Sequence, residues 1–148
     1  MITMGLVYAD IELINGGDLE MVRRHLMDED EVKRMTIRFL VDSGACNLCI
    51  NEVIQQQLQL PVVEKRKAQM ANGSIEEFDV VGNVEVRFKN RATSCRAMVL
   101  PGDAEPLFGE IPMEDMDLII HPLKEELMVN PEHPFFAQMV LKAVTLIN

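Results

Sequence analysis

The run Asp42, Ser43 and Gly44 is the part of this sequence whose residue types could do chemistry. An aspartate on a loop can act as a general base that takes a proton from water, provided that its partner groups are placed correctly. The same three residue types also favour ordinary surface turns, so the run taken alone leaves a plain turn open. The elements around it must decide between the two interpretations.

Other residues of catalytic or metal-binding type lack a supporting pattern. Cys46 and Cys49 have the spacing of a redox motif, but no second pair exists, and small buried hydrophobic residues are the favoured interpretation. A cysteine protease built on either thiol has no local sequence support. His25, His121 and His133 are scattered without the spacing of metal ligands, so we predict no metal and no cofactor.

The segment before Asp42 has the pattern of a strand. Residues 35–41 alternate between apolar and other side chains, the period of two expected where one face of a sheet is buried. An earlier strand is predicted at 8–14, with a turn at 15–17. Residues 18–31 fit either a helix or a strand that ends in an acidic turn, and we favour the strand. Residues 51–58 begin with a capping residue and predict a short helix.

The second half of the chain predicts more short strands. Asn72 and Gly73 give a hairpin signal between residues 68–71 and 74–78. Helical spacing appears at 135–148. The remaining expected elements are strands at 80–88, 94–100, 118–120 and 127–129 and a helical turn around 112–116. Many short strands with one or two short helices are typical of a small all-β barrel or sandwich.

Composition narrows the class of protein. The 148 residues suffice for one domain, and 48% hydrophobic with 26% charged residues is typical of a globular protein. A formal charge of −10 disfavours nucleic acid as a partner, because phosphate binding depends on Lys and Arg. No stretch is long enough to cross a membrane, and the N-terminus lacks secretory features. Three cysteines in such a chain fit reduced thiols, so we expect a cytoplasmic protein.

The landmarks occur in one order that resembles a known family. A strand leads into residues 41–45 (Val-Asp-Ser-Gly-Ala), an Asn-Gly hairpin follows at 72–73, and a Leu-Phe-Gly triplet lies at 107–109. This arrangement resembles the retroviral-type (retropepsin-like) aspartic proteases of clan AA, particularly their short bacterial relatives. The similarity covers roughly 8–129, and residues 112–117 and 130–134 look like the C-terminal pattern of the bacterial group.

The resemblance implies a role for each loop residue. Asp42 corresponds to the catalytic aspartate, and Ser43 to the hydroxyl residue that braces the paired loops across a dimer. Gly44 corresponds to the small residue that lets two backbones approach at the two-fold axis, which fits a residue without Cβ. Ala45 is a candidate for substrate binding. The implied fold is a small closed barrel of the acid-protease type.

The resemblance also implies a flap. Asn72 and Gly73 are similar to the tip of the hairpin that closes over substrate, and both are substrate-binding candidates. An ordinary hairpin turn is the competing interpretation. Residues 107–109 resemble the segment that packs beneath the catalytic loop.

Hydrolysis by this route uses two carboxylates that share one proton. The sequence has no second Asp followed by Ser or Thr and then Gly, so a single chain holds half of the dyad. We therefore expect a homodimer in which a two-fold axis brings two copies of Asp42 together. The expected function is an aspartic endopeptidase acting on protein or peptide substrates.

A rival interpretation shares every motif. A non-catalytic dimeric module that binds peptides or other proteins could use the same fold. Residues 1–130 are predicted to form the protease-like domain and 131–148 a C-terminal extension. That tail is longer than in the viral enzymes, whose terminal strands interleave in the dimer.

Overall fold

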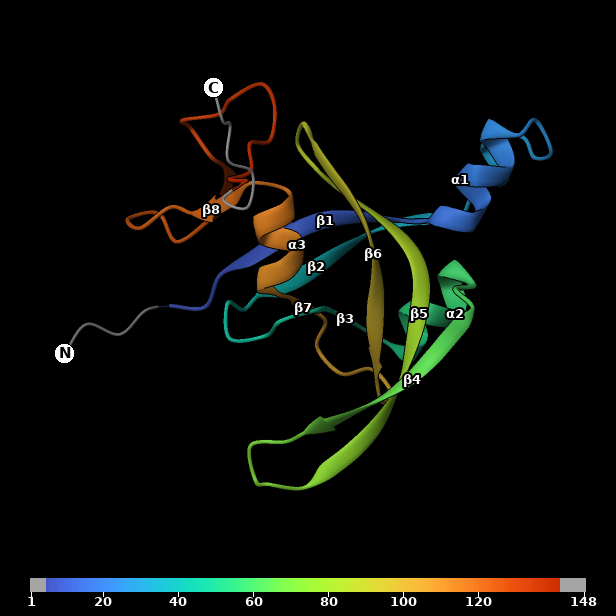
Figure 1. Cartoon of the computed structure of the whole chain (residues 1–148), viewed down its shortest axis with the longest axis horizontal. Coiled ribbons are helices and arrows are strands. Elements are labelled where there is room, and N and C mark those ends of the chain that lie inside the picture. Colours follow the sequence, from blue (N-terminus) through green and yellow to red (C-terminus); the bar gives the residue numbers. More distant parts are fainter. Residues whose placement is uncertain (1–4, 142–148) are drawn as a thin grey trace, which may run out of the picture.

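The computed structural model describes residues 5–141, and its main feature is one large sheet that closes on itself (Figure 1). The order of strands is β1-β2-β7-β3-β6-β5-β4, and β1 also pairs with β5, so six strands form a ring. The strands are β1 (Tyr8–Asn15), β2 (Arg34–Val41), β3 (Leu48–Asn51), β4 (Val62–Gln69), β5 (Ile75–Phe88), β6 (Arg91–Leu100) and β7 (Leu107–Phe108). The closed sheet and the predominance of strands confirm the predicted all-β fold.

A second, smaller sheet and short helices lie around the ring. The strands β8 (Leu118–Ile120) and β9 (Leu127–Val129) pair as the antiparallel hairpin expected from the sequence. The helices are α1 (Gly16–Arg23), α2 (Glu52–Leu58), α3 (Glu110–Asp115) and the 3-10 turn η1 (Glu29–Glu31). The described residues thus hold three α-helices where one or two were expected. None of these helices is long and apolar enough to cross a lipid bilayer.

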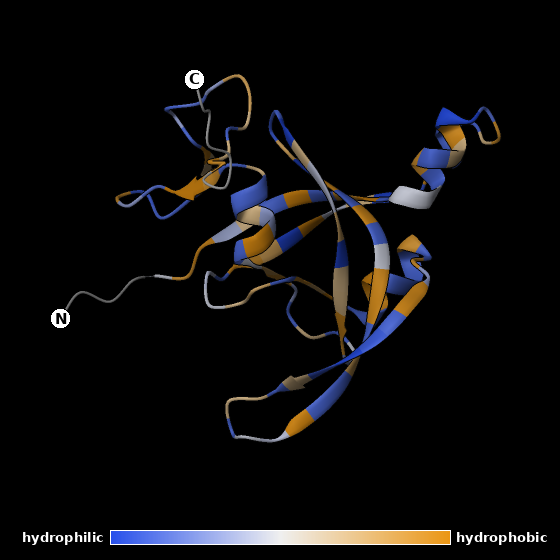
Figure 2. Cartoon of the chain, viewed as in Figure 1, coloured by the Kyte–Doolittle hydropathy of each residue, from blue (hydrophilic) through white to orange (hydrophobic). Residues whose placement is uncertain are grey.

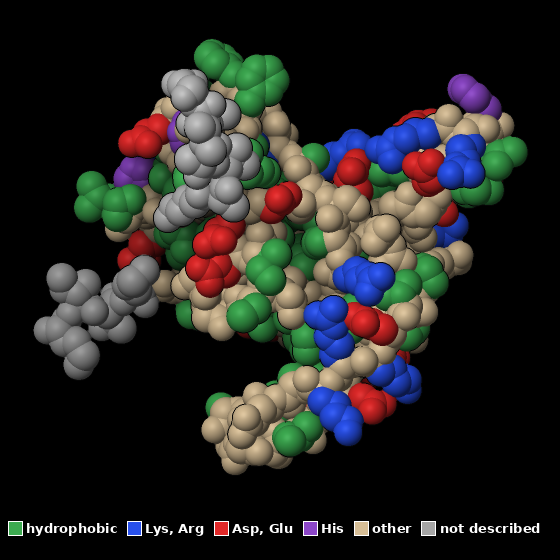
Figure 3. Space-filling view, in the orientation of Figure 1, with side chains coloured by type: hydrophobic (Ala, Val, Ile, Leu, Met, Phe, Trp, Pro, Cys, Tyr) green, Lys and Arg blue, Asp and Glu red, His purple; other side chains and the backbone are tan. Residues whose placement is uncertain are grey.

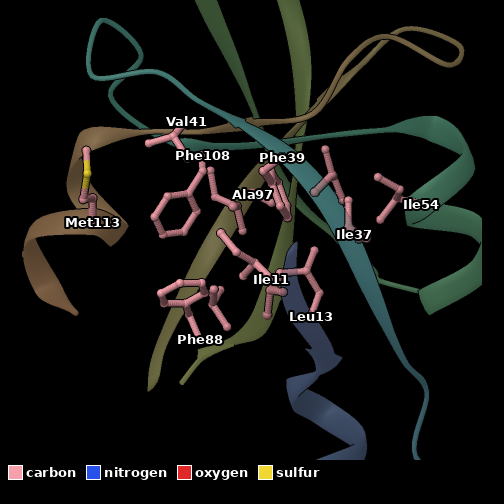
Figure 4. Close-up of a cluster of buried hydrophobic side chains, with 14 of the residues drawn as sticks. Ile11, Leu13, Ile37, Phe39, Val41, Ile54, Phe88, Ala97, Phe108 and Met113 are labelled. Atoms are coloured by element: carbon pink, nitrogen blue, oxygen red, sulfur yellow. The ribbon is translucent and has the colours of Figure 1, made fainter. Parts of the chain in front are cut away.

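The core fills the inside of the ring. Apolar and polar residues alternate along much of β1, β2 and β5 (Figure 2), so one face of each of these strands points inward. The rings of Phe39 and Phe108 meet edge to face with centroids 6.0 Å apart, and both residues are fully buried. Ile11 and Leu13 enter the same cluster from β1 (Figure 4). Burying a side chain of this size stabilises the fold by roughly 2 kcal/mol.

The prediction of a strand within residues 18–31 is wrong, because that segment begins with α1. Asn15, at the end of β1, accepts a hydrogen bond from Asp18 N at 3.1 Å and so caps the helix. Its amide also donates to Leu58 O at 2.8 Å, which ties the helix start to α2. Residues 15–17 therefore start a helix and do not form the expected turn. Leu19 has helical spacing and packs in a small cluster beside β1.

Residues 130–138, here called the C-terminal strap, are tied to the end of the domain by one aspartate. Asp117 accepts hydrogen bonds from Asn130 Nδ2 at 3.1 Å and Gln138 N at 3.0 Å. Its Oδ2 also lies 2.7 Å from His133 Nδ1. Residues 135–141 do not adopt the helix that their spacing suggested, and 142–148 lie outside the described residues.

The turn between β5 and β6 holds the other side of the strap. Arg91, which is almost fully buried, donates a hydrogen bond to the carbonyl oxygen of His133. Asn90 donates to Pro134 O at 2.9 Å. The first half of the strap is therefore bonded to its own chain at several points.

Substituting Asp117 should loosen the strap in a pH-dependent way. Desolvation opposes ionisation of Asp117, but its hydrogen bonds from Gln138, Asn130 and His133 outweigh this and hold its pKa below the usual value. A carboxyl with a lowered pKa adds stability above its unfolded pKa, and this is lost as pH falls through the folded pKa. Asp117→Asn should lower the free energy of unfolding by about 2 kcal/mol at pH 7, with little difference in strong acid.

Denaturant titration at several pH values measures this difference. Asp117 has a φ of 53°, which Asn also tolerates, so backbone strain does not enter the comparison. The exposed Asp103→Asn is the control and should be neutral. A loss that is equal at pH 7 and in acid would contradict the role of the charge.

Candidate active site

The end of β2 and the strand β7 fix the start of the Asp42 loop. The two strands are parallel, with Val41 opposite Phe108. Asp42 N continues this ladder by donating to Phe108 O at 3.0 Å. Since β7 pairs with β3 on its other side, the loop between β2 and β3 must cross the end of β7. Asp42 therefore leaves the sheet directly from a hydrogen-bonded strand end.

Hydrogen bonds within the loop orient the carboxylate. Gly44 N donates to Asp42 Oδ1 at 2.9 Å, and Ala45 N donates to Asp42 O at 3.1 Å. Within residues 5–141, Oδ2 of Asp42 accepts no hydrogen bond. Asp42 is half-buried, whereas Ser43 and Gly44 are exposed. The structure therefore presents one free carboxylate oxygen on an exposed, internally braced loop.

The start of α3 supports the loop from below. Glu110 N donates to Ala45 O at 2.8 Å, and Ile111 N donates to Cys46 O at 2.9 Å. Gly109 precedes them, and a Cβ built there would lie 2.3 Å from Asn47 O and 2.8 Å from Ala45 O. The backbones approach so closely that only glycine fits.

The hairpin of β4 and β5 forms a long arm with the predicted Asn-Gly turn at its tip. Gly73 has a φ of 86°, and its N–H donates to Met70 O at 2.9 Å. Asn72 Oδ1 accepts hydrogen bonds from the N–H and the hydroxyl of Ser74. In Figure 1 the tip lies on the same side of the barrel as the loop between β2 and β3. Figure 3 shows an open hollow between this arm and the body of the protein.

The structure separates the predicted site residues into two groups. Asp42, Ser43, Gly44 and Ala45 share the loop, and the hairpin tip with Gly73 lies across the hollow. The contribution of the first turn of α3 could not be predicted from the sequence, because a backbone N–H has no side-chain signature. The glycine at the end of the Leu-Phe-Gly triplet was the only sequence signal for this contact.

The cysteines occupy different environments. Burial, with a smaller effect of the Asp42 charge, raises the pKa of Cys49 to about 11. Burial, with the Asp115 charge, likewise raises the pKa of Cys95 to about 11. Cys46 is exposed, so the prediction that it is a buried hydrophobic residue is wrong. All three thiols are unpaired.

A surface pocket lies away from the Asp42 loop. It has a volume of about 840 Å³ and is lined by residues of β1 and β9, including Tyr8 and Leu127. Asp42 is not part of it. We place the candidate site at the loop, because there a carboxylate stands on a hydrogen-bonded turn opposite a long hairpin.

Comparison with known proteins agrees with this geometry. A closed sheet that carries an Asp-Ser-Gly loop beneath a hairpin defines an acid protease-like fold. A family model for aspartyl proteases matches residues 30–122, more than half of the chain, which therefore belongs to the aspartyl protease family. Matching solved structures include the retroviral protease-like domain of Ddi1 from Leishmania major, with a TM-score of 0.55 over 87% of this chain and 91% of that chain. At 13% identity this likeness shows the fold alone. No curated protein sequence matches the chain.

Gly109→Ala should destabilise the protein by about 3 kcal/mol, because the new methyl group would collide with two backbone carbonyl oxygens that cannot rotate away. Denaturant titration measures the loss. Gly102→Ala is the matched control, since a Cβ there meets nothing within 4 Å. Its positive φ should still cost about 1 kcal/mol, since alanine is strained in that conformation. Equal losses for the two variants would show that the close approach at Gly109 is not a constraint.

Proposed function

We propose that the chain is an aspartic endopeptidase whose catalytic dyad consists of Asp42 from each of two identical chains. The observation that carries the proposal is the Asp42 carboxylate, held through Oδ1 by Gly44 N at 2.9 Å on an exposed loop. Membership of the aspartyl protease family supports the same chemistry. Because the sequence contains no second Asp-Ser/Thr-Gly run, a second copy supplies the other carboxylate.

The proposed chemistry follows from two like charges at short distance. Carboxyl groups about 3 Å apart resist simultaneous ionisation, so the pair holds one proton. The ionised group takes a proton from water, which attacks the carbonyl carbon of the peptide bond. The protonated group donates its proton to the carbonyl oxygen as negative charge develops there. When the tetrahedral intermediate collapses, the C–N bond breaks, the proton taken from water passes to the leaving nitrogen, and the proton on the carbonyl oxygen returns to the pair of aspartates. Ser43 is exposed beside Asp42, where its hydroxyl can brace the opposing loop.

The substrate proposed for this site is a peptide in extended conformation. Such a peptide can lie in the hollow beneath the β4–β5 arm and hydrogen-bond to it as an added strand. We propose that the tip with Asn72 and Gly73 is a flap that closes over the peptide, with Ala45 forming part of the opposite wall. The reaction needs water and the two aspartates, with no cofactor.

The setting that we propose is the cytoplasm. Three unpaired cysteines fit a reducing compartment. The formal charge of −10 favours protein or peptide partners over nucleic acid.

Replacing the catalytic carboxyl should remove activity and leave the fold intact. Asp42→Asn cannot accept the proton of water, and kcat should fall at least about a thousandfold. Cleavage of a peptide library between about pH 3 and 7, with and without pepstatin, provides the measurement. Asp30→Asn, at the exposed acidic turn η1, is the control for loss of one negative charge. Undiminished cleavage by the Asp42→Asn variant would contradict the proposal.

The flap can be tested at its glycine. Gly73→Val places a β-branched residue at a φ of 86°, which should deform the tip and lower kcat/KM at least about tenfold. Nothing lies within 4 Å of a Cβ at Gly73, so the fold should persist. Gly73→Asn is the matched variant, because Asn tolerates positive φ and should retain most activity. Unchanged kinetics of Gly73→Val would count against a flap.

The same assays address the rival function. A dimer that binds peptides but never cleaves them, across the whole pH range, would be the non-catalytic module. If the protein is such a module, a labelled peptide should bind the Asp42→Asn variant as tightly as the unmodified protein.

A further inference from the structure

Two exposed apolar residues lie beside the Asp42 loop, one bonded to it through its own backbone and the other through the backbone of the next residue. Ile111, 55% exposed, follows Glu110 in the first turn of α3 and hydrogen-bonds to Cys46 O at 2.9 Å. Leu6, 70% exposed, precedes Val7, whose carbonyl accepts a hydrogen bond from Val41 N at 2.8 Å. Both residues are therefore held close to the ends of the loop that carries the catalytic aspartate.

The position of this pair matters because the proposed site is incomplete in one chain. If two copies of Asp42 meet at a two-fold axis, whatever surrounds the loop must lie at the contact. In Figure 1 the start of β1, the loop after β2 and α3 occupy one side of the barrel, away from α1. Two chains that each carry −10 repel one another, so the contact must be apolar or hydrogen-bonded enough to outweigh this repulsion.

The C-terminal elements are not free to supply that contact by exchange between chains. Leu118 of β8 and Leu127 of β9 are buried in the core of their own chain. Asp117 and Arg91 hold the strap that follows β9 through Asn130 Nδ2 and the carbonyl of His133. Exchange of the hairpin would first have to break these bonds and withdraw two core leucines before the same contacts could form with the partner chain.

We propose that the homodimer forms through an apolar collar of Leu6 and Ile111 around each Asp42 loop, while β8, β9 and the strap stay with their own chain. The inference rests on the proposed function and adds the surface by which the two halves of the dyad meet. Because the contact is isologous, each dimer contains two copies of every collar residue. One substitution therefore acts twice.

Ile111→Glu tests the collar. It places two carboxylates in an apolar contact, and the dissociation constant of the dimer should rise at least about a hundredfold. Sedimentation equilibrium of the full chain, without substrate, gives this constant. Ile111 contributes its backbone N–H to the loop, which the substitution retains, and the free energy of unfolding of the monomer checks that the fold survives.

Cys46 provides an independent footprint of the same contact. It is exposed on the loop, whereas the thiols of Cys49 and Cys95 are protected by burial. Reaction of Cys46 with N-ethylmaleimide should slow as protein concentration rises through the dimerisation range. Ile111→Glu should keep the reaction fast at every concentration. A rate that is independent of concentration in a dimeric protein would place the contact elsewhere and overturn the collar.

Two control variants carry the same change at other exposed apolar residues. Leu26→Glu lies beyond α1 and is 67% exposed, and Phe136→Glu lies in the strap and is 83% exposed. Both should leave the dissociation constant unchanged. A dimer that tolerates Ile111→Glu but dissociates with Phe136→Glu would show that the strap forms the interface and would overturn the inference.

Failure of the collar and failure of the function give different results. If Ile111→Glu weakens the dimer but the protein cleaves no peptide, the interface is supported and the peptidase function is rejected. If the protein cleaves peptides and its dimer is unaffected by Ile111→Glu, the function is supported and the collar is rejected. If the chain remains monomeric at all concentrations, both proposals are rejected.

Discussion

The parallel pairing of β2 with β7 is the constraint on which the candidate site depends. It continues past the strand end through the bond from Asp42 N to Phe108 O, so the aspartate is fixed by the barrel itself. Gly109 follows Phe108, and because it has no side chain the backbone of loop residues 45–47 can approach it closely. A strand of two residues, Leu107–Phe108, thereby positions both the loop and the start of α3. Disturbing β7 would move the carboxylate and its support together.

Much of the fold could be predicted from local patterns. The alternation before Asp42, the Asn-Gly turn and the capping of α2 by Asn51 each have a local cause and appear in the structure. The segment after β1 was wrongly predicted to be a strand, although its cap, from Asn15 to Asp18 N, is local; the bond that ties this helix start to Leu58 joins residues 43 positions apart and has no local signal. Ring closure is likewise non-local, since no pattern in β1 or β5 specifies that they pair.

The part of the candidate site that is local in sequence could be predicted. Asp42, Ser43 and Gly44 are contiguous, so a short run of sequence contains them. The contacts of Glu110 and Ile111 with the loop use backbone atoms, and the exposure of Cys46 depends on where β3 begins. The anchoring of the strap joins Asp117 to Gln138 and Arg91 to His133 by contacts that only the folded chain reveals.

The closure of the ring sets an order of events during synthesis. β1 joins β5 by pairing Glu12 with Arg87 and Asn15 with Val84, so the barrel cannot close until most of β5 has left the ribosome. Until then Ile11 and Leu13, which end fully buried, have only part of their packing surface. Pairing between strands that are far apart in the sequence is slow compared with forming helices or hairpins. The nascent chain therefore passes through a stage in which the apolar face of its first strand is still exposed to solvent.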